Sequence, residues 1–422
     1  MAGADERPRV VVVGAGLAGL VAAERLAARG RSVTLLEASP KAGGRCRSYE
    51  DARLDRVIDN GNHLILSSNR AVLGWAERIG GAAALETGEA VFPFVDLETG
   101  AAWTLRVGRG PFGALGRAAR PPGARLGPLL RDMARIGVAR GTVGDAVLER
   151  GPAWRGFWDP MSRAVLNEAP ERGDAGLLRA VLLRAFARGA EAARPVLAPG
   201  GLGSALVEPA LAHLARMGVA PRLRTPVAAI ERVDGRAVAL RLRDGAIPLG
   251  PRDAMVLAVP VGPLAALMPD LALPGPGPAI ANAHFRVAAS RLAPVTAVLG
   301  GASQWLFRRG DVVSVTVSAA ERSALAGLDR DAALALLWRE VRAVLARLGE
   351  APAAAMPPAR FLREKAATFD QSPEGVRRRP STRTALRNVV LAGDHVATGL
   401  PATLEGAVLS GERAAAALLG EG

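Results

Sequence analysis

At 422 residues the chain is too long for one ordinary hydrophobic core, so two domains are the starting expectation. Half of the residues (50%) are hydrophobic and 22% are charged, which excludes a disordered chain. The single cysteine, Cys46, excludes an internal disulfide framework and a cysteine metal cluster. We therefore expect no metal, and a reducing cytoplasm is the expected location.

The formal net charge of +14 comes almost entirely from arginine and favours an anionic partner. Genome composition accounts for much of this arginine bias. With 4% aromatic residues, one tyrosine and no recognition module in the sequence, nucleic acid is not expected as a partner. An anionic membrane surface is the partner that remains.

The first predicted elements are a strand, a glycine turn, a helix and a second strand in RVVVVGAGLAGLVAAERLAARGRSVTLLEAS. The apolar run from Val10 is about 14 residues long, too short to span a bilayer. Gly14, Gly16 and Gly19 form G-x-G-x-x-G, in which the middle glycine lets the backbone approach a pyrophosphate. Glu37 ends the second strand, where an acid accepts hydrogen bonds from ribose hydroxyls. This context predicts a dinucleotide site.

A second glycine pair follows the acid. Gly43 and Gly44 precede Arg45, which suits a long cofactor whose phosphate or flavin-proximal part the arginine can reach. The alternative is a solvated loop.

The C-terminal stretch NVVLAGDHVATGLPATLEGAVLSG predicts a strand, a turn at Gly393 and Asp394, and a helix that begins near Thr403. Together with the N-terminal motifs it resembles the flavin amine oxidase and carotenoid desaturase superfamily. The resemblance implies FAD, an α/β fold with a Rossmann-like FAD-binding domain, and an inserted α+β substrate domain. It also implies that the helix dipole at Thr403 and Leu404 faces the isoalloxazine, and that Val227 lies near the adenine.

This resemblance divides the chain into alternating segments. The FAD-binding domain is expected over 8–85, 196–265 and 381–422, and the substrate domain over 86–195 and 266–380. Within the first insertion, arginines alternate with apolar residues over 105–140. The segment is predicted either to rest on an anionic bilayer or to form a basic helical pair with a solvated face.

The stretch RVIDNGNHLI places Asp59, Asn60, Asn62 and His63 around one glycine. Such residues cap turns, so a structural turn is one interpretation. The other is an active-site wall, because DNG-x-H and the block FWDPMSRAVLNEAPERGDAGLLRAVLLRAF (157–186) resemble the hydroxysqualene dehydroxylases. The family pattern has glutamine where this chain has Asn62, which is one methylene shorter.

The resemblance implies that reduced FAD replaces the allylic hydroxyl of hydroxysqualene with hydride, giving squalene and water for hopanoid or carotenoid synthesis. His63 is the expected proton donor, with Asp59 orienting it or raising its pKa. His395, Glu405 and bound water are the alternative donors. The enzyme is expected in the cytoplasm, possible partners being the inner membrane face and upstream squalene-pathway enzymes. Two other interpretations remain: a carotenoid or phytoene desaturase, and a non-catalytic lipid carrier resembling GDP-dissociation inhibitors.

Overall fold

The first described residues fold as the strand, glycine turn, helix and second strand that the sequence predicts. The computed structural model describes residues 8–186, 188–288 and 290–421. Strand β1 (Arg9–Val13) leads through the turn into helix α1 (Leu17–Ala28), and strand β2 (Ser32–Leu36) pairs with β1 in parallel. The apolar run is therefore a buried strand that continues into a helix, as predicted.

Strand β1 lies at the centre of a five-stranded parallel sheet with the order β10-β2-β1-β14-β20. The other strands come from later parts of the chain: β10 (Pro221–Arg222), β14 (Ala254–Leu257) and β20 (Val389–Leu391). All three segments expected to form the FAD-binding domain thus contribute strands to one sheet. The exact boundaries of the five segments stay predictions.

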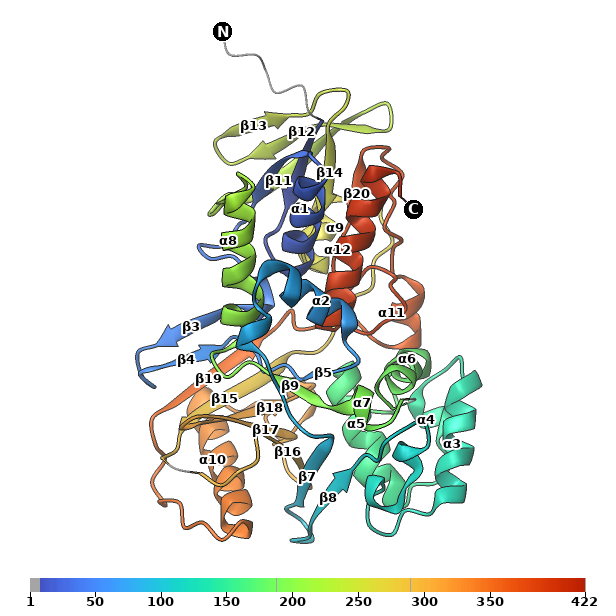
Figure 1. The fold of residues 1–422 in the computed structure, drawn as a ribbon, viewed down its shortest axis with the longest axis vertical. Coiled ribbons are helices and arrows are strands. Elements are labelled where there is room, and N and C mark those ends of the chain that lie inside the picture. The colour runs from blue at the N-terminus through green and yellow to red at the C-terminus, as the bar shows by residue number, and fades with distance from the viewer. Residues whose placement is uncertain (1–7, 187, 289, 422) are drawn as a thin grey trace.

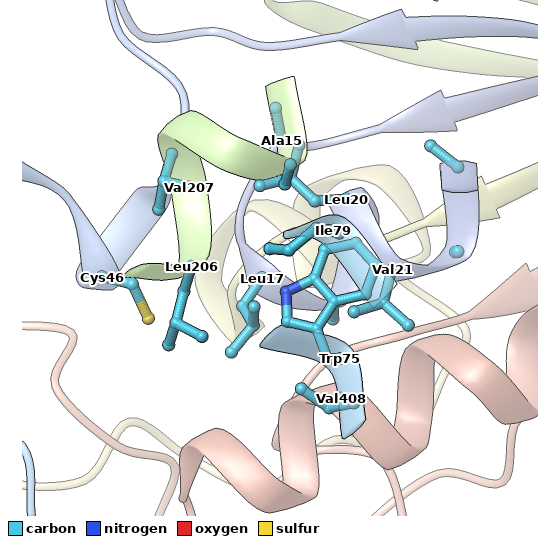
Figure 2. Packing of buried hydrophobic residues seen from close by; sticks show 14 of the residues in the cluster. Ala15, Leu17, Leu20, Val21, Cys46, Trp75, Ile79, Leu206, Val207 and Val408 are labelled. Atoms are coloured by element: carbon cyan, nitrogen blue, oxygen red, sulfur yellow. The ribbon is translucent and has the colours of Figure 1, made fainter. Parts of the chain in front are cut away.

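Successive strand residues point to opposite sides, so both faces of this sheet carry apolar side chains. Both faces are covered by other elements (Figure 1). Helix α1 shares one face with α2 (Arg70–Ile79), α8 (Glu208–Arg216) and α12 (Leu404–Leu419). Figure 2 shows this layer, in which Trp75, Val21 and Val408 pack together. The other face carries α9 (Val261–Leu267) and an antiparallel sheet of β11 (Val227–Val233), β12 (Arg236–Leu242) and β13 (Gly245–Pro248).

The two insertions build a second, seven-stranded sheet in the lower half of Figure 1, with the order β19-β15-β18-β17-β16-β7-β8. Its strands are β7 (Val91–Asp96), β8 (Ala102–Arg106), β15 (Ile280–Arg286), β16 (Val295–Leu299), β17 (Trp305–Arg309), β18 (Val312–Val317) and β19 (Ala359–Glu364). Helix α10 (Arg330–Arg347) buries its apolar side against one face. Strands more than 180 residues apart, such as β7 and β16, therefore pair directly.

The remainder of the first insertion is a helical lobe, seen at the lower right of Figure 1. Its helices are α3 (Leu126–Val138), α4 (Val143–Ala146), α5 (Asp159–Leu166), α6 (Ala175–Phe186) and α7 (Ala190–Ala193). Helices α3 to α6 pack around the fully buried Trp158, which ends a π-helical turn at Trp154–Trp158. The segment 105–140 holds only one long helix, α3, so the helical pair predicted there is wrong.

Short elements connect the two halves of the molecule. They are the hairpin of β3 (Ser48–Asp51) and β4 (Arg56–Asp59), the small sheet of β5 (Ile65–Leu66), β6 (Glu86–Thr87) and β9 (Pro195–Leu197), and helix α11 (Pro373–Arg377). The stretch RVIDNGNHLI begins on β4 and ends on β5, so it crosses between the halves. Within the described ranges, every helix is too short or too polar to cross a bilayer.

Candidate active site

The glycine turn after β1 leaves open space at only one of its three motif glycines. Gly14 has a φ of +102°, and a Cβ there would overlap the Ala258 carbonyl. A Cβ on Gly19 would overlap the Gly14 carbonyl, so Gly19 lets α1 pack closely on the strand. A Cβ on Gly16, by contrast, would meet nothing within 4 Å. Gly16 therefore faces the space that a pyrophosphate needs at the helix N-terminus.

The acid at the end of β2 lies beside this turn. The Glu37 carboxylate accepts hydrogen bonds from the backbone N–H groups of Ala15 and Ser39, each at 2.8 Å. Carboxylate oxygens have further lone pairs for ribose hydroxyls. The Thr225 N–H donates to the Glu37 carbonyl at 2.8 Å, and Val227 begins β11 two residues later. The sheet end therefore brings together the residues predicted to hold the ribose and the adenine.

The second glycine pair returns to the first motif. Gly43 forms a bridge with Gly16, and a Cβ on Gly44 would lie 3.2 Å from the Gly16 Cα. The next residue, Arg45, donates from Nη2 to Asp394 Oδ1 at 2.7 Å. Although burial would raise the pKa of Asp394, the Arg45 guanidinium holds that pKa below its ordinary value. The two halves of the predicted FAD motif thus meet as one ion pair, although they are about 350 residues apart.

The loop before α12 is held from beneath by a residue that the sequence did not single out. The Arg379 guanidinium donates to four carbonyls of this loop, those of Asp394, His395, Val396 and Leu400. It also lies over the Phe369 ring, with Cζ 4.6 Å from the ring centroid. Thr403 caps the helix by accepting from the Gly406 N–H at 3.1 Å, which confirms the predicted helix start. Arg379 therefore fixes the loop on which Gly393 and Asp394 lie.

A cavity of about 310 Å³ extends from these motifs into the substrate half of the molecule. Its end nearest the predicted FAD motifs is lined by Arg45, Thr403 and Leu404. Its walls are mostly apolar and come from the seven-stranded sheet and the helical lobe: Phe92, Phe94, Leu105, Phe157, Met161, Val165, Val181, Phe186, Ile280, Trp305 and Phe307. The FWDP block thus lines the cavity, which suits a long apolar substrate.

Strand alternation explains how the sheet makes this wall. On β17 and β18, Leu306 and Val315 face the core under α10, whereas their neighbours Phe307 and Thr316 face the cavity. The same alternation on β15 directs Asn282 into the cavity. One face of the sheet is therefore a core and the other a ligand surface.

Asp59 does not orient His63, so that part of the prediction is wrong. Its carboxylate accepts from the Ser48 hydroxyl and from the Leu202 N–H at 3.0 Å, and forms an ion pair with Arg309 at 2.9 Å. Asp59 ends β4 and is buried, so its charge needs these partners. Its field still raises the pKa of His63, but burial has the larger effect and lowers that pKa overall.

The His63 ring lines the cavity and contacts its own loop. Nδ1 lies 2.9 Å from the Gly61 carbonyl oxygen. A carbonyl only accepts, so Nδ1 carries a hydrogen, and in the neutral ring Nε2 is an acceptor. Because burial lowers the pKa of His63, the ring must gain a proton at Nε2 before it can act as a donor. The donor role of His63 stays a prediction.

The two residues named as alternative proton donors differ in whether they line the cavity and in how burial shifts their pKa. His395 is buried, its pKa is lowered to about 4 by burial, and it is outside the cavity lining. Glu405 lines the cavity, and burial raises its pKa. Its carboxylate also accepts from the N–H groups of Ala71 and Val72, at 3.1 and 3.0 Å. Glu405 is thus better placed than His395 to hold a proton.

Comparison with known proteins decides the family. Residues 17–419 match the family of flavin containing amine oxidoreductases. Hydroxysqualene dehydroxylases from Rhodopseudomonas palustris and Sinorhizobium fredii are 41% and 39% identical, over 98% of this chain and 99% and 98% of theirs. The chain belongs to the hydroxysqualene dehydroxylase family.

Structural comparison agrees with this membership. Cyclohexylamine oxidase from Brevibacterium oxydans IH-35A superposes with a TM-score of 0.74 at 15% identity, over 98% of this chain and 99% of that one. At this identity the likeness shows the fold alone. As a member of this family, the chain is an FAD-dependent oxidoreductase. The cofactor and the family expected from the sequence are therefore confirmed.

Proposed function

We propose that this enzyme removes the allylic hydroxyl of hydroxysqualene to give squalene. The names of its full-length relatives support this substrate. The observation that carries the proposal is the long apolar cavity that begins at the flavin motifs and is lined by the FWDP block. A C30 hydrocarbon chain fits such walls, because burial of apolar surface is favourable.

The reaction needs a hydride, a proton and a dry cavity. Bound reduced FAD would supply the hydride, and the allylic hydroxyl would take up a proton and leave as water. The apolar side chains of Phe157, Trp305 and Phe307 line the cavity and would shield the allylic cation from water. His63 and Glu405 are two ionisable residues of the cavity lining that can bring the proton to the leaving oxygen.

Anaerobic single turnover tests the proposal. Dithionite-reduced enzyme mixed with hydroxysqualene should form one squalene per flavin reoxidised. Phytoene offered to the oxidised enzyme is the control for a desaturase and should leave the flavin oxidised. Flavin reduction by phytoene, with no squalene from hydroxysqualene, would overturn the proposal.

We also infer that the helical lobe rests on an anionic membrane. Large apolar side chains are exposed on the lobe: Phe112 (76%), Val138 (81%), Leu148 (58%) and Leu183 (62%). The same insertion also carries exposed arginines: Arg106 at the end of β8, and Arg109, Arg117, Arg125, Arg131, Arg135 and Arg140. Aliphatic insertion with guanidinium groups at anionic headgroups is the pattern of an interfacial protein.

The lobe also lines the cavity, so an insoluble substrate would have a short path from the membrane to the cavity. The cytoplasmic side and contact with upstream enzymes stay predictions.

A further inference from the structure

The apolar wall of the cavity contains one amide that is only partly satisfied. Asn282 lies on β15 and is 1% exposed. Its Oδ1 accepts from the Thr316 hydroxyl at 2.9 Å and from Asn62 Nδ2 at 3.3 Å. Its own Nδ2 is buried without a hydrogen-bond partner among the described residues. An amide nitrogen in an apolar wall is costly to leave unpaired, so a ligand acceptor is expected there.

The neighbouring bonds fix which end of the Asn282 amide carries nitrogen. Asn62 Nδ2 donates to the Thr316 oxygen at 3.0 Å, so the Thr316 hydroxyl hydrogen is free to point at Asn282. With Asn62 in this orientation, two donors converge on one end of the Asn282 amide, and that end is the oxygen. The nitrogen is the end without a protein partner.

This nitrogen and the His63 ring both lie beside Gly61 in the cavity lining. A Cβ on Gly61 would lie 3.7 Å from Asn282 Nδ2 and 3.7 Å from His63 Cε1. Neutral His63 has an acceptor at Nε2, and a protonated ring has a donor there. A donor amide and a ring that either accepts or donates are together complementary to a hydroxyl group.

We propose that Asn282, oriented by Asn62 and Thr316, donates a hydrogen bond to the oxygen of the substrate's allylic alcohol while His63 contacts the same oxygen. This hydroxyl subsite rests on the proposed function. It adds a way for the enzyme to distinguish the alcohol substrate from the hydrocarbon product. The alcohol satisfies the buried amide, whereas the hydrocarbon product leaves it unpaired. The subsite therefore retains the substrate and favours release of the product.

The test is the binding preference of the FAD-loaded, oxidised enzyme, which does not turn over. Hydroxysqualene and squalene are titrated in the same micelles, and binding is followed by the change in flavin absorbance. Wild-type enzyme should prefer the alcohol, and Asn282→Leu should reduce this preference by about 10- to 100-fold. Ile280→Val, on the same face of β15, is the matched control and should weaken both ligands equally.

A second variant avoids disturbing the hydrogen-bond network. Gly61→Ala adds a methyl at ordinary contact distance from Asn282 and His63, so the protein should fold with these side chains in place. The methyl narrows the space beside Asn282 Nδ2 and the His63 ring and should also reduce the preference. If wild-type enzyme converts hydroxysqualene but both variants keep its preference, the subsite is wrong. If wild-type enzyme neither prefers nor converts hydroxysqualene, the proposed function itself fails.

Discussion

At the scale of single residues, substitutions at Gly16 and Gly19 should have different effects: the first on FAD binding, the second on the stability of the fold. The Gly16→Val side chain would project into space that the protein leaves open, so the variant should fold but retain much less FAD. Gly19→Ala would overlap the Gly14 carbonyl and should lower the free energy of unfolding by about 1–3 kcal/mol. The ratio of flavin to protein absorbance and urea unfolding measure the two effects. A full flavin complement in Gly16→Val would show that the pyrophosphate lies elsewhere.

His63 is tested by the pH dependence of single turnover. If it donates the proton, His63→Ala should keep FAD and lose about 10²- to 10⁴-fold in rate. Burial lowers the pKa of His63, so its protonated fraction is small at neutral pH and should fall about tenfold per pH unit above that pKa. The wild-type rate should therefore rise as pH falls from 8 to 6. A similar rise in His63→Ala would assign the proton to another group, and Glu405 is then the first to test.

Asp59 belongs to a structural ion pair. Asp59→Asn would leave the Arg309 guanidinium without its anion and should lower the free energy of unfolding by about 1–3 kcal/mol. The folded fraction should lose less rate than His63→Ala, because Gly61 holds the His63 ring and Asp59 acts on it only through a charge that raises its pKa. A large loss of rate at unchanged stability would restore a catalytic role.

At the scale of elements, α12 caps α2. Asn69 precedes α2 but makes no side-chain cap, and Glu405 supplies the missing acceptor to two N–H groups. Glu405→Ala should lower the free energy of unfolding by about 1–2 kcal/mol, and Glu405→Gln, which keeps one acceptor, by less. Denaturant unfolding at saturating FAD measures this. Equal stability of both variants would mean that water replaces the cap. Loss of turnover in the glutamine variant at nearly wild-type stability would indicate a proton role.

At the scale of the whole molecule, the exposed apolar residues of the helical lobe predict where a membrane binds. The double variant Phe112→Ser, Val138→Ser should bind anionic liposomes at least about tenfold more weakly, because each side chain contributes about 1.5–3 kcal/mol when buried. Val233→Ser changes a similarly exposed valine (55%) on β11, in the opposite half of Figure 1, and should have no effect. Binding of the wild type should weaken as salt rises. An equal loss of liposome binding in Val233→Ser would show that the helical lobe is not the membrane-binding surface.

The N-terminal strand, turn and helix, the capped start of α12 and the two glycine motifs were predictable from the sequence. Each depends on residues a few positions apart, because turn geometry and helix capping are local. The FAD cofactor followed from their combination and from a family resemblance.

Tertiary structure alone decided which polar groups meet. Asp59 and His63 are close in sequence, yet Arg309 takes the Asp59 charge because β17 brings it there. Asn282 was detectable only as a lone amide in an apolar strand, and its contact with Asn62 spans 220 residues. Arg379 reaches its loop carbonyls in the same way. Such contacts depend on strand register and packing, which bring distant residues together and which no local pattern encodes.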